Sequence, residues 1–141
     1  MIWERACRET DYRFFMDLIV KTLKPYVEEY QKFDHEYVRD SFRQTWPQMK
    51  MIMSGSRRIG FYQIEGHEDT LMVKRIFLSP AYQKKGIGKR IMKEFENLGY
   101  KRIRLEVWDN NPAVDFYKNL GYKVKKKEGH KVHMERSLNQ D

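Results

Sequence analysis

The sequence is poor in cysteine: Cys7 is the single one among 141 residues. One cysteine cannot form a disulfide within the chain, so the fold must be stabilised by its core. No residue pattern around this thiol suggests a partner that would activate it as a nucleophile, which favours a small, buried apolar side chain. A chain without disulfides fits a reducing compartment, and we expect a cytoplasmic protein.

Long hydrophobic runs are also missing. No apolar run approaches the roughly 20 residues that a membrane-spanning helix needs, and the N-terminal stretch MIWERACRETDYR is charged where a secretory signal would be apolar. We therefore expect no membrane association. The composition, 40% hydrophobic, 14% aromatic and 34% charged, is typical of a globular chain. Its length is that of one domain, so we expect a single domain over residues 1–141.

Acidic residues are in the minority, with 20 Asp and Glu against 28 Lys and Arg, which gives a net charge of +8 and a pI near 9.5. Such a charge attracts nucleic acid, an acidic membrane surface or a phosphate-rich cofactor. The lysines are scattered, and no known nucleic-acid-binding motif is present. We therefore expect no nucleic-acid partner.

The hydrophobic pattern predicts alternating groups of strands and helices. A first strand at 2–7 precedes two helices, one capped by Thr10 or Asp11 and ended by Pro25, the other starting at Asp34. Three strands follow over 48–78, with turns at 54–56 and 66–69. A helix from 87 to 98 with Gly99 as its cap, a strand at 102–107, a helix from Asn111 to Gly121 and a hairpin around 128–129 complete the chain. This order predicts a mixed sheet with helices on its faces.

The segment from Ile76 to Lys89 is a strand that passes through a glycine-containing loop into a helix. Gly86 and Gly88 allow a ligand to approach the backbone, and the helix N-terminus favours an anion such as a pyrophosphate. A Walker loop is excluded because Arg90, not Ser or Thr, follows Lys89, and a dinucleotide fingerprint would require glycine at position 91. A structural turn with solvated lysines is the alternative interpretation of this pattern.

The sequence around this loop resembles that of the GNAT superfamily of acyl-CoA-dependent N-acyltransferases. RIFLSPAYQKKGIGKRIMKEF is similar to the family's pyrophosphate-binding strand, loop and helix, and LEVWDNNPAVDFYKNLGY to its following strand, Asn-containing loop and Tyr-bearing helix. The resemblance covers residues 71–122. It implies a mixed, mostly antiparallel sheet with a V-shaped splay between the two central strands and helices on both faces.

The resemblance also implies a set of cofactor-binding residues. The backbone of Ile76, Phe77 and Leu78 would pair with the pantetheine arm, and one amide there would face the thioester oxygen. Asn110 would contact the pantetheine; Asn111 fits the family spacing when counted from Glu106, but Pro112 gives it a helix-capping role. The pyrophosphate would be bound by the loop Gln83, Lys84, Lys85, Gly86, Ile87, Gly88 and Lys89.

Two residues are expected to carry the proton transfers. Tyr117 would donate a proton to the leaving thiolate, the alternative being an aromatic core residue on its helix. Glu106 resembles the proton-accepting glutamate of ribosomal-protein N-terminal acetyltransferases, the alternative being a surface stripe with Arg104. A metal site is not expected. The polar cluster His67-Glu68-Asp69 lies in a predicted turn, where adjacent side chains rarely point toward one metal ion.

These features together predict an N-acetyltransferase. Acetyl-CoA would be the cosubstrate and a primary amine of unknown identity the acceptor, attacked directly in a ternary complex. The amine would approach past the N-terminal helices, which offer aromatic and acidic side chains: Tyr26, Glu28, Glu29, Tyr30, Asp34 and Tyr37. A non-catalytic acyl-CoA-binding regulatory domain is the alternative function. A homodimer paired through sheet edges is compatible with this type of fold.

Overall fold

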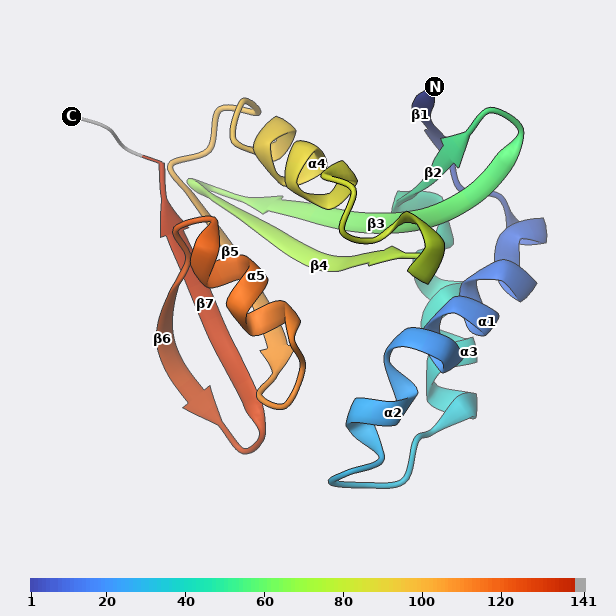
Figure 1. The fold of residues 1–141 in the computed structure, drawn as a ribbon, viewed down its shortest axis with the longest axis horizontal. Coiled ribbons are helices and arrows are strands. Elements are labelled where there is room, and N and C mark those ends of the chain that lie inside the picture. Colours follow the sequence, from blue (N-terminus) through green and yellow to red (C-terminus); the bar gives the residue numbers. More distant parts are fainter. Residues whose placement is uncertain (139–141) are drawn as a thin grey trace. The chain divides into compact units, whose positions relative to one another are not determined.

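The computed structural model describes residues 1–138 (Figure 1). Its strands are β1 Ile2–Ala6, β2 Met49–Ser54, β3 Arg57–His67, β4 Thr70–Leu78, β5 Arg102–Trp108, β6 Lys123–Glu128 and β7 Lys131–Ser137. Its α-helices are α1 Tyr12–Thr22, α2 Lys24–Val27, α3 His35–Thr45, α4 Ile87–Phe95 and α5 Ala113–Asn119. Short 3-10 turns lie at Glu9–Asp11, Trp46–Gln48 and Pro80–Tyr82. The order of elements is the predicted one.

The strands form a seven-stranded sheet in the order β1-β2-β3-β4-β5-β7-β6. β1 with β2, β2 with β3, β5 with β7 and β6 with β7 are antiparallel, whereas β4 and β5 are parallel. The predicted mixed, mostly antiparallel α/β class is therefore confirmed. The parallel ladder joins Thr70–Val73 to Arg102–Leu105 and ends before either strand does. A splay between two central strands requires such an early end of their ladder.

The chain falls into two compact units, each assembled from two separate stretches of sequence. Unit 1 comprises Met1–Gln63 and Arg75–Lys85, and unit 2 comprises Ile64–Lys74 and the chain from Gly86 onward. Strands β3 and β4 therefore contribute residues to both units. The expectation of a single domain over 1–141 stays a prediction.

Aromatic rings form the core of unit 1. The ring of Phe15, on α1, lies 4.9 Å from the ring of Phe42 on α3 and 4.9 Å from that of Phe61 on β3. All three side chains are fully buried, together with Met49, Met51 and Ile52 of β2. Helices α1 and α3 thus pack on their sheet through aromatic contacts, each worth about 0.5–1.5 kcal/mol beyond the burial of area.

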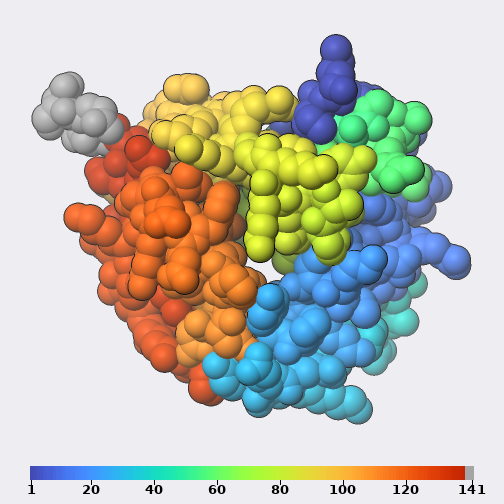
Figure 2. All heavy atoms as spheres, in the orientation of Figure 1, coloured from blue at the N-terminus to red at the C-terminus, as the bar shows by residue number. Residues whose placement is uncertain are grey.

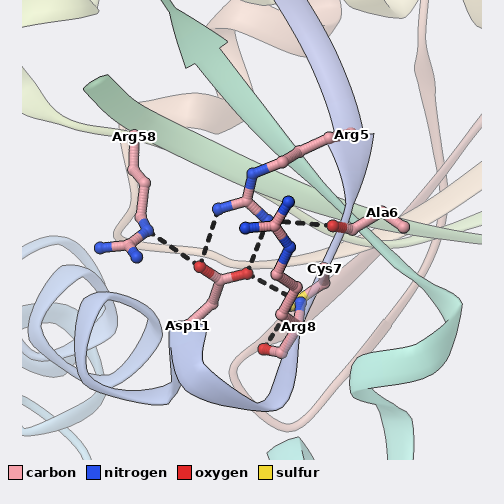
Figure 3. A network of polar contacts seen from close by, with 6 residues as sticks. All are labelled: Arg5, Ala6, Cys7, Arg8, Asp11 and Arg58. Carbon is pink, nitrogen blue, oxygen red and sulfur yellow. Dashed lines mark hydrogen bonds and ion pairs between the residues drawn. The ribbon is translucent and has the colours of Figure 1, made fainter. Parts of the chain in front are cut away.

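A charged residue, Asp11, is also completely buried in unit 1 (Figure 3). Its carboxylate accepts two hydrogen bonds of 2.9 Å from the guanidinium of Arg5 and one of 2.8 Å from the Arg8 amide, and the Arg58 Nε atom lies 2.8 Å away. Asp11 precedes α1, as predicted, but its side chain does not cap that helix. No local pattern indicated that two arginines from β1 and β3 would bind it instead.

This network keeps Asp11 ionised. Burial alone would raise the pKa of its carboxyl, but the hydrogen bonds from Arg5 and Arg8 and the charges of Arg5 and Arg58 outweigh burial and lower the pKa below its ordinary value. Cys7, next to the network, is buried as expected, and burial with the nearby carboxylate raises the pKa of its thiol to about 12. The thiol therefore stays protonated and unreactive at neutral pH.

The core of unit 2 contains mostly aliphatic side chains from its strands and helices. Strand β5 alternates as predicted, with Ile103, Leu105 and Val107 buried between more exposed neighbours, and α4 adds Ile91, Met92 and Phe95 to the core. Helix α4 ends at Phe95 rather than at the predicted Leu98, which is 53% exposed. Residues 96–98 donate to carbonyls three positions earlier, so the helix tightens into 3-10 turns before left-handed Gly99.

None of the helices within residues 1–138 combines the length and the apolar character needed to cross a bilayer.

Candidate functional site

The loop between β4 and α4 follows a defined path. Gln83 has an extended backbone and Lys84 a left-handed one, with a φ of 60°. These two conformations in succession are those of the central residues of a type II turn. The Gln83 side-chain amide donates a 2.9 Å hydrogen bond to the carbonyl of Leu78, so the loop is tied back to the end of its strand. The segment is largely exposed and lies at the molecular surface (Figure 2, yellow-green).

Helix α4 begins without a cap. Its N-cap residue Gly86 is left-handed, with a φ of 82°, and no side chain of residues 1–138 caps the helix. The first backbone bond of the helix runs from Arg90 N–H to the carbonyl of Gly86, at 3.0 Å. The amides of Gly86, Ile87, Gly88 and Lys89 are thus donors without an intrahelical acceptor. Donors of this kind at the positive end of a helix dipole fit a pyrophosphate.

Cationic side chains flank this helix start along the sequence. Lys84, Lys85, Lys89 and Arg90 are exposed, and the Lys85 Nζ atom lies 5.7 Å from the centre of the Tyr82 ring. Arg90 also lies 3.8 Å from Glu94, one helical turn further on. The lysines of the loop have no carboxylate within 4 Å in the described part of the chain. Their charge is therefore available to an anion.

The end of β4 is held by close packing in unit 1. A Cβ atom at Gly60 would collide with the backbone carbonyl of Phe77 and with the Leu78 side chain. The Phe77 ring lies 5.4 Å from that of Phe61, and the Ser79 amide donates to the carbonyl of Ile59 at 2.8 Å. Glycine at position 60 thus allows β3 to approach the three residues predicted to pair with pantetheine, Ile76, Phe77 and Leu78.

Gly60→Ala should therefore destabilise the protein by about 1–3 kcal/mol, the usual effect of overpacking. The colliding atom belongs to the backbone, so a change of rotamer cannot relieve the clash. Thermal or denaturant unfolding measures the effect. Gly66→Ala combined with Tyr100→Ala is an informative comparison, because all the atoms that clash at Gly66 belong to the Tyr100 side chain, which this second change removes. Wild-type stability in Gly60→Ala would contradict the close approach.

Tyr117, on α5, is 8% exposed. Its ring lies 5.2 Å from that of Phe116 and 5.7 Å from that of Tyr122, a packing that is compatible with both interpretations, so its role as an acid stays a prediction. Burial raises the pKa of the Tyr117 phenol, which keeps the proton on the oxygen at neutral pH. A buried, protonated phenol retains the ability to donate.

The loop before α5 contains two neighbouring asparagines, and the structure shows a side-chain bond of Asn111 to the start of the helix. The side-chain oxygen of Asn111 accepts a 2.9 Å hydrogen bond from the Ala113 amide, and its carbonyl accepts from Val114 at 3.0 Å. The N-cap of α5 is Pro112, so Asn111, the predicted cap, binds the first amide of the helix from one position before the observed cap. Asn110 is half-buried in the same turn, and its contact with a cofactor stays a prediction.

Glu106 lies on the exposed face of β5, opposite His133 in the ladder with β7. Its Oε1 atom is 3.6 Å from His133 Nε2, which is also 3.1 Å from Glu128. Arg104, suggested as its partner in a surface stripe, instead donates to Glu135 at 2.6 Å. His133 was not predicted as a neighbour, because the pairing depends on the register of two strands separated along the chain.

The side chains expected to meet an acceptor differ in exposure. Tyr37 is 70% exposed and Tyr30 38% exposed, as a binding surface requires, whereas Tyr26 is half-buried. The Asp34 side chain accepts from the Tyr37 amide at 2.9 Å and caps α3, as the predicted helix start implies. Within residues 1–138, no three His, Cys, Asp or Glu side chains gather closely enough to hold a metal ion.

The sequence matches the model of the acetyltransferase (GNAT) domain over residues 50–124, more than half of the chain. The chain belongs to this family, and the predicted family and enzyme class, a GNAT-type acyltransferase, are confirmed. No curated protein matches the sequence significantly.

Solved structures of acetyltransferases share the fold. The PaiA N-acetyltransferase of Thermoplasma acidophilum, in complex with coenzyme A, has a TM-score of 0.76 and 21% identity, with 97% of this chain and 99% of that chain covered. An acetyltransferase of Thermus thermophilus has a TM-score of 0.78 and 14% identity, with 97% of each chain covered. YncA of Salmonella typhimurium, a putative acetyltransferase with its cofactor acetyl-CoA, has a TM-score of 0.65 and 12% identity, with 100% and 96% covered.

Proposed function

We propose that this protein transfers the acetyl group of acetyl-CoA to a primary amine. The observation that carries the proposal is the uncapped start of α4, where four consecutive amides, from Gly86 to Lys89, have no intrahelical acceptor in a chain of the GNAT family. The structures of PaiA with coenzyme A and of YncA with acetyl-CoA, which share the fold, support this cosubstrate.

Bound acetyl-CoA would supply a thioester, whose acetyl carbon forms a bond to the amine nitrogen while its bond to sulfur breaks. The backbone of Ile76, Phe77 and Leu78 would bind the pantetheine arm, and Asn110 would add a side-chain contact. The pyrophosphate would lie on the loop Gln83, Lys84, Lys85, Gly86, Ile87, Gly88 and Lys89. In this loop Gln83 would act by holding the turn to Leu78, because its side-chain amide already donates there.

The reaction needs one proton removed and one delivered. The amine loses a proton, and we assign Glu106 as its acceptor. The Nε2 atom of His133 lies 3.6 Å from the Glu106 carboxylate. The leaving sulfur gains a proton, for which we assign the Tyr117 phenol. Alkyl thiols and phenols have reference pKa values of about 8.5 and 10, so donation to a thiolate is uphill by little in water. Burial raises the pKa of the Tyr117 phenol, and an apolar site would raise that of the leaving thiol in the same direction. Direct transfer in a ternary complex requires no covalent enzyme intermediate.

The acceptor amine, in this proposal, approaches past the exposed aromatic and acidic side chains of the N-terminal helices, in the cytoplasm. Neither nucleic acid nor a membrane takes part, and a homodimer is compatible with the proposal.

A calorimetric titration with acetyl-CoA tests the proposal. Gly86→Trp should abolish saturable binding, because the indole would occupy the space at the helix start. Gly129→Trp is the matched control: Gly129 is also left-handed, with a φ of 60°, and, as at Gly86, no heavy atom lies within 4 Å of an added Cβ. The control variant carries a similar backbone strain in the β6–β7 turn and should bind normally.

Saturable binding followed by amine-dependent release of thiol would support an enzyme. Saturable binding without turnover on any amine would favour the regulatory acyl-CoA-binding alternative. Absence of binding in a folded wild-type protein would overturn both.

A further inference from the structure

Arg75 is a partly buried cation of unit 1 that has no anionic partner among residues 1–138. It lies on β4, immediately before the three residues assigned to pantetheine. Its Nη2 atom donates to the hydroxyl of Ser41 on α3, and its guanidinium carbon lies 5.1 Å from the centre of the Phe15 ring. No sequence pattern singles out Arg75, because Ser41 and Phe15 come from distant parts of the chain.

No carboxylate lies within 4 Å of this guanidinium among residues 1–138. The nearby acids of α3 are used elsewhere: Glu36 pairs with Arg39, and Asp40 lies close to Arg39 and Arg43. The Nη1 atom of Arg75 is buried and has no hydrogen-bond partner. Burial lowers the pKa of Arg75, an effect only partly offset by the Tyr37 phenol nearby, but the group stays charged.

A partly buried charge without a counter-ion costs free energy, because the hydration that the guanidinium loses is not replaced by a partner of opposite charge. The contact with the Phe15 ring offsets only part of this cost, because an aromatic face carries no net negative charge. The buried Nη1 group of Arg75 therefore lacks both a hydrogen-bond acceptor and a negative charge among the described residues. A ligand that brings the missing negative charge would satisfy it.

We propose that Arg75 binds a carboxylate on the acceptor, so that the substrates are amines that also carry a carboxylate; the inference rests on the proposed acetyl transfer. Ser41 accepts from Arg75 and keeps its hydroxyl proton to donate to the same carboxylate. Tyr37, which is 70% exposed on the same helix as Ser41, would lie on the solvent side of such a site. The guanidinium offers one positive charge, which matches a carboxylate better than a doubly charged phosphate.

Direct binding tests the site without turnover. In protein labelled with ¹⁵N-arginine, the Nε–H resonance of Arg75 is the one lost in Arg75→Lys. L-lysine should shift this resonance in a saturable way, whereas cadaverine, which has the same two amines without the carboxylate, should not. Equal effects of the two compounds, or no effect of either, would overturn the inference. A larger effect of phosphoethanolamine would replace the carboxylate by a phosphate and overturn it as well.

Kinetics with the same pair give a second readout. The ratio of kcat/KM for L-lysine to that for cadaverine should fall by about tenfold to a hundredfold in Arg75→Met, which is the usual loss for one charged hydrogen-bonded contact. The loss should appear mainly in KM for the carboxylated amine. An unchanged ratio in Arg75→Met would contradict the assignment.

Stability separates binding from a structural role. Arg75→Met removes an uncompensated charge and keeps the volume near Phe15, so it should unfold at the same or a higher temperature than wild type. A lower unfolding temperature with unchanged discrimination between the amines would make Arg75 a structural residue.

Acetyl-CoA affinity, measured by calorimetry, keeps the two proposals apart. Arg75→Met should bind acetyl-CoA as wild type does. If the wild type failed to bind acetyl-CoA but its Arg75 resonance still responded to L-lysine and not to cadaverine, acetyl transfer would be refuted and the carboxylate site would stand.

Discussion

Tyr117→Phe is expected to lower kcat by about a hundredfold to ten-thousandfold, the range found for loss of a general acid. The substitution removes one oxygen and keeps the ring that packs against Phe116 and Tyr122, so the affinity for acetyl-CoA should be nearly unchanged. Steady-state kinetics with any active amine, together with a titration of the cosubstrate, measure both quantities. A fully active variant would remove Tyr117 as the sole acid.

Tyr122→Phe is the matched control. The Tyr122 hydroxyl is buried and has no hydrogen-bond partner among the described residues. Removing such a group is neutral or stabilising for the fold and leaves the proposed acid in place. The control should therefore retain wild-type kcat, and a comparable loss in both variants would point to disturbed packing of the aromatic pair rather than to lost proton donation.

The same phenol predicts a pH dependence. Because burial raises the pKa of Tyr117, the group stays protonated, and competent as an acid, up to higher pH than an exposed tyrosine. The kcat profile should therefore show no loss of activity near the ordinary phenol pKa of about 10 from ionisation of Tyr117. An alkaline limb at the ordinary phenol pKa that vanishes in Tyr117→Phe would contradict this.

Asp11→Asn should lower the free energy of unfolding by about 3–5 kcal/mol, because it leaves the arginine charge of a buried pair uncompensated. Arg5, whose side chain is 12% exposed, would lose both of its hydrogen bonds to a carboxylate. Denaturant unfolding measures the difference. Asp40→Asn is the control: Asp40 also lies near two arginines, at 3.7 and 3.9 Å, but its side chain is 52% exposed, so the effect should be small.

Asp11 also makes stability depend on pH. Its pKa is lower in the folded state than in the unfolded state, so its contribution is fully present above the unfolded pKa of about 4 and is lost as the pH falls through the folded value. The wild type should lose stability below about pH 4 more steeply than Asp11→Asn. Parallel acid-unfolding curves for the two proteins would show that Asp11 is not ionised in the fold.

Local patterns in the sequence predicted most elements, because periodicity and caps are local properties. The alternation at Ile103, Leu105 and Val107 identified β5, and Asn111-Pro112 marked the start of α5. The end of α4 was misplaced because Leu98 fits the helical period but stays exposed, and period alone does not reveal where packing stops.

The candidate site divides along the same line. The loop predicted to bind pyrophosphate is contiguous in the sequence, so its two glycines and the family resemblance around them were enough to propose it. The environments of Glu106 and Arg75 depend on partners brought near by strand register or by helix packing, namely His133 and Ser41. Asp11 shows the same limit most clearly. Its position in the sequence predicted a helix cap, but its carboxylate is buried and binds Arg5 of β1 and Arg58 of β3.

The interleaved composition of the two units has a consequence for how the chain can fold during synthesis. Unit 1 lacks the end of β4 until residue 85 has been made, and unit 2 takes residues 64–74 from between the two stretches of unit 1. No single cut therefore separates the units into two fragments that each contain all their residues. A nascent chain released from the ribosome before the last hairpin would leave β5 without its neighbour β7. Completion of the sheet thus awaits the arrival of the C-terminal strands.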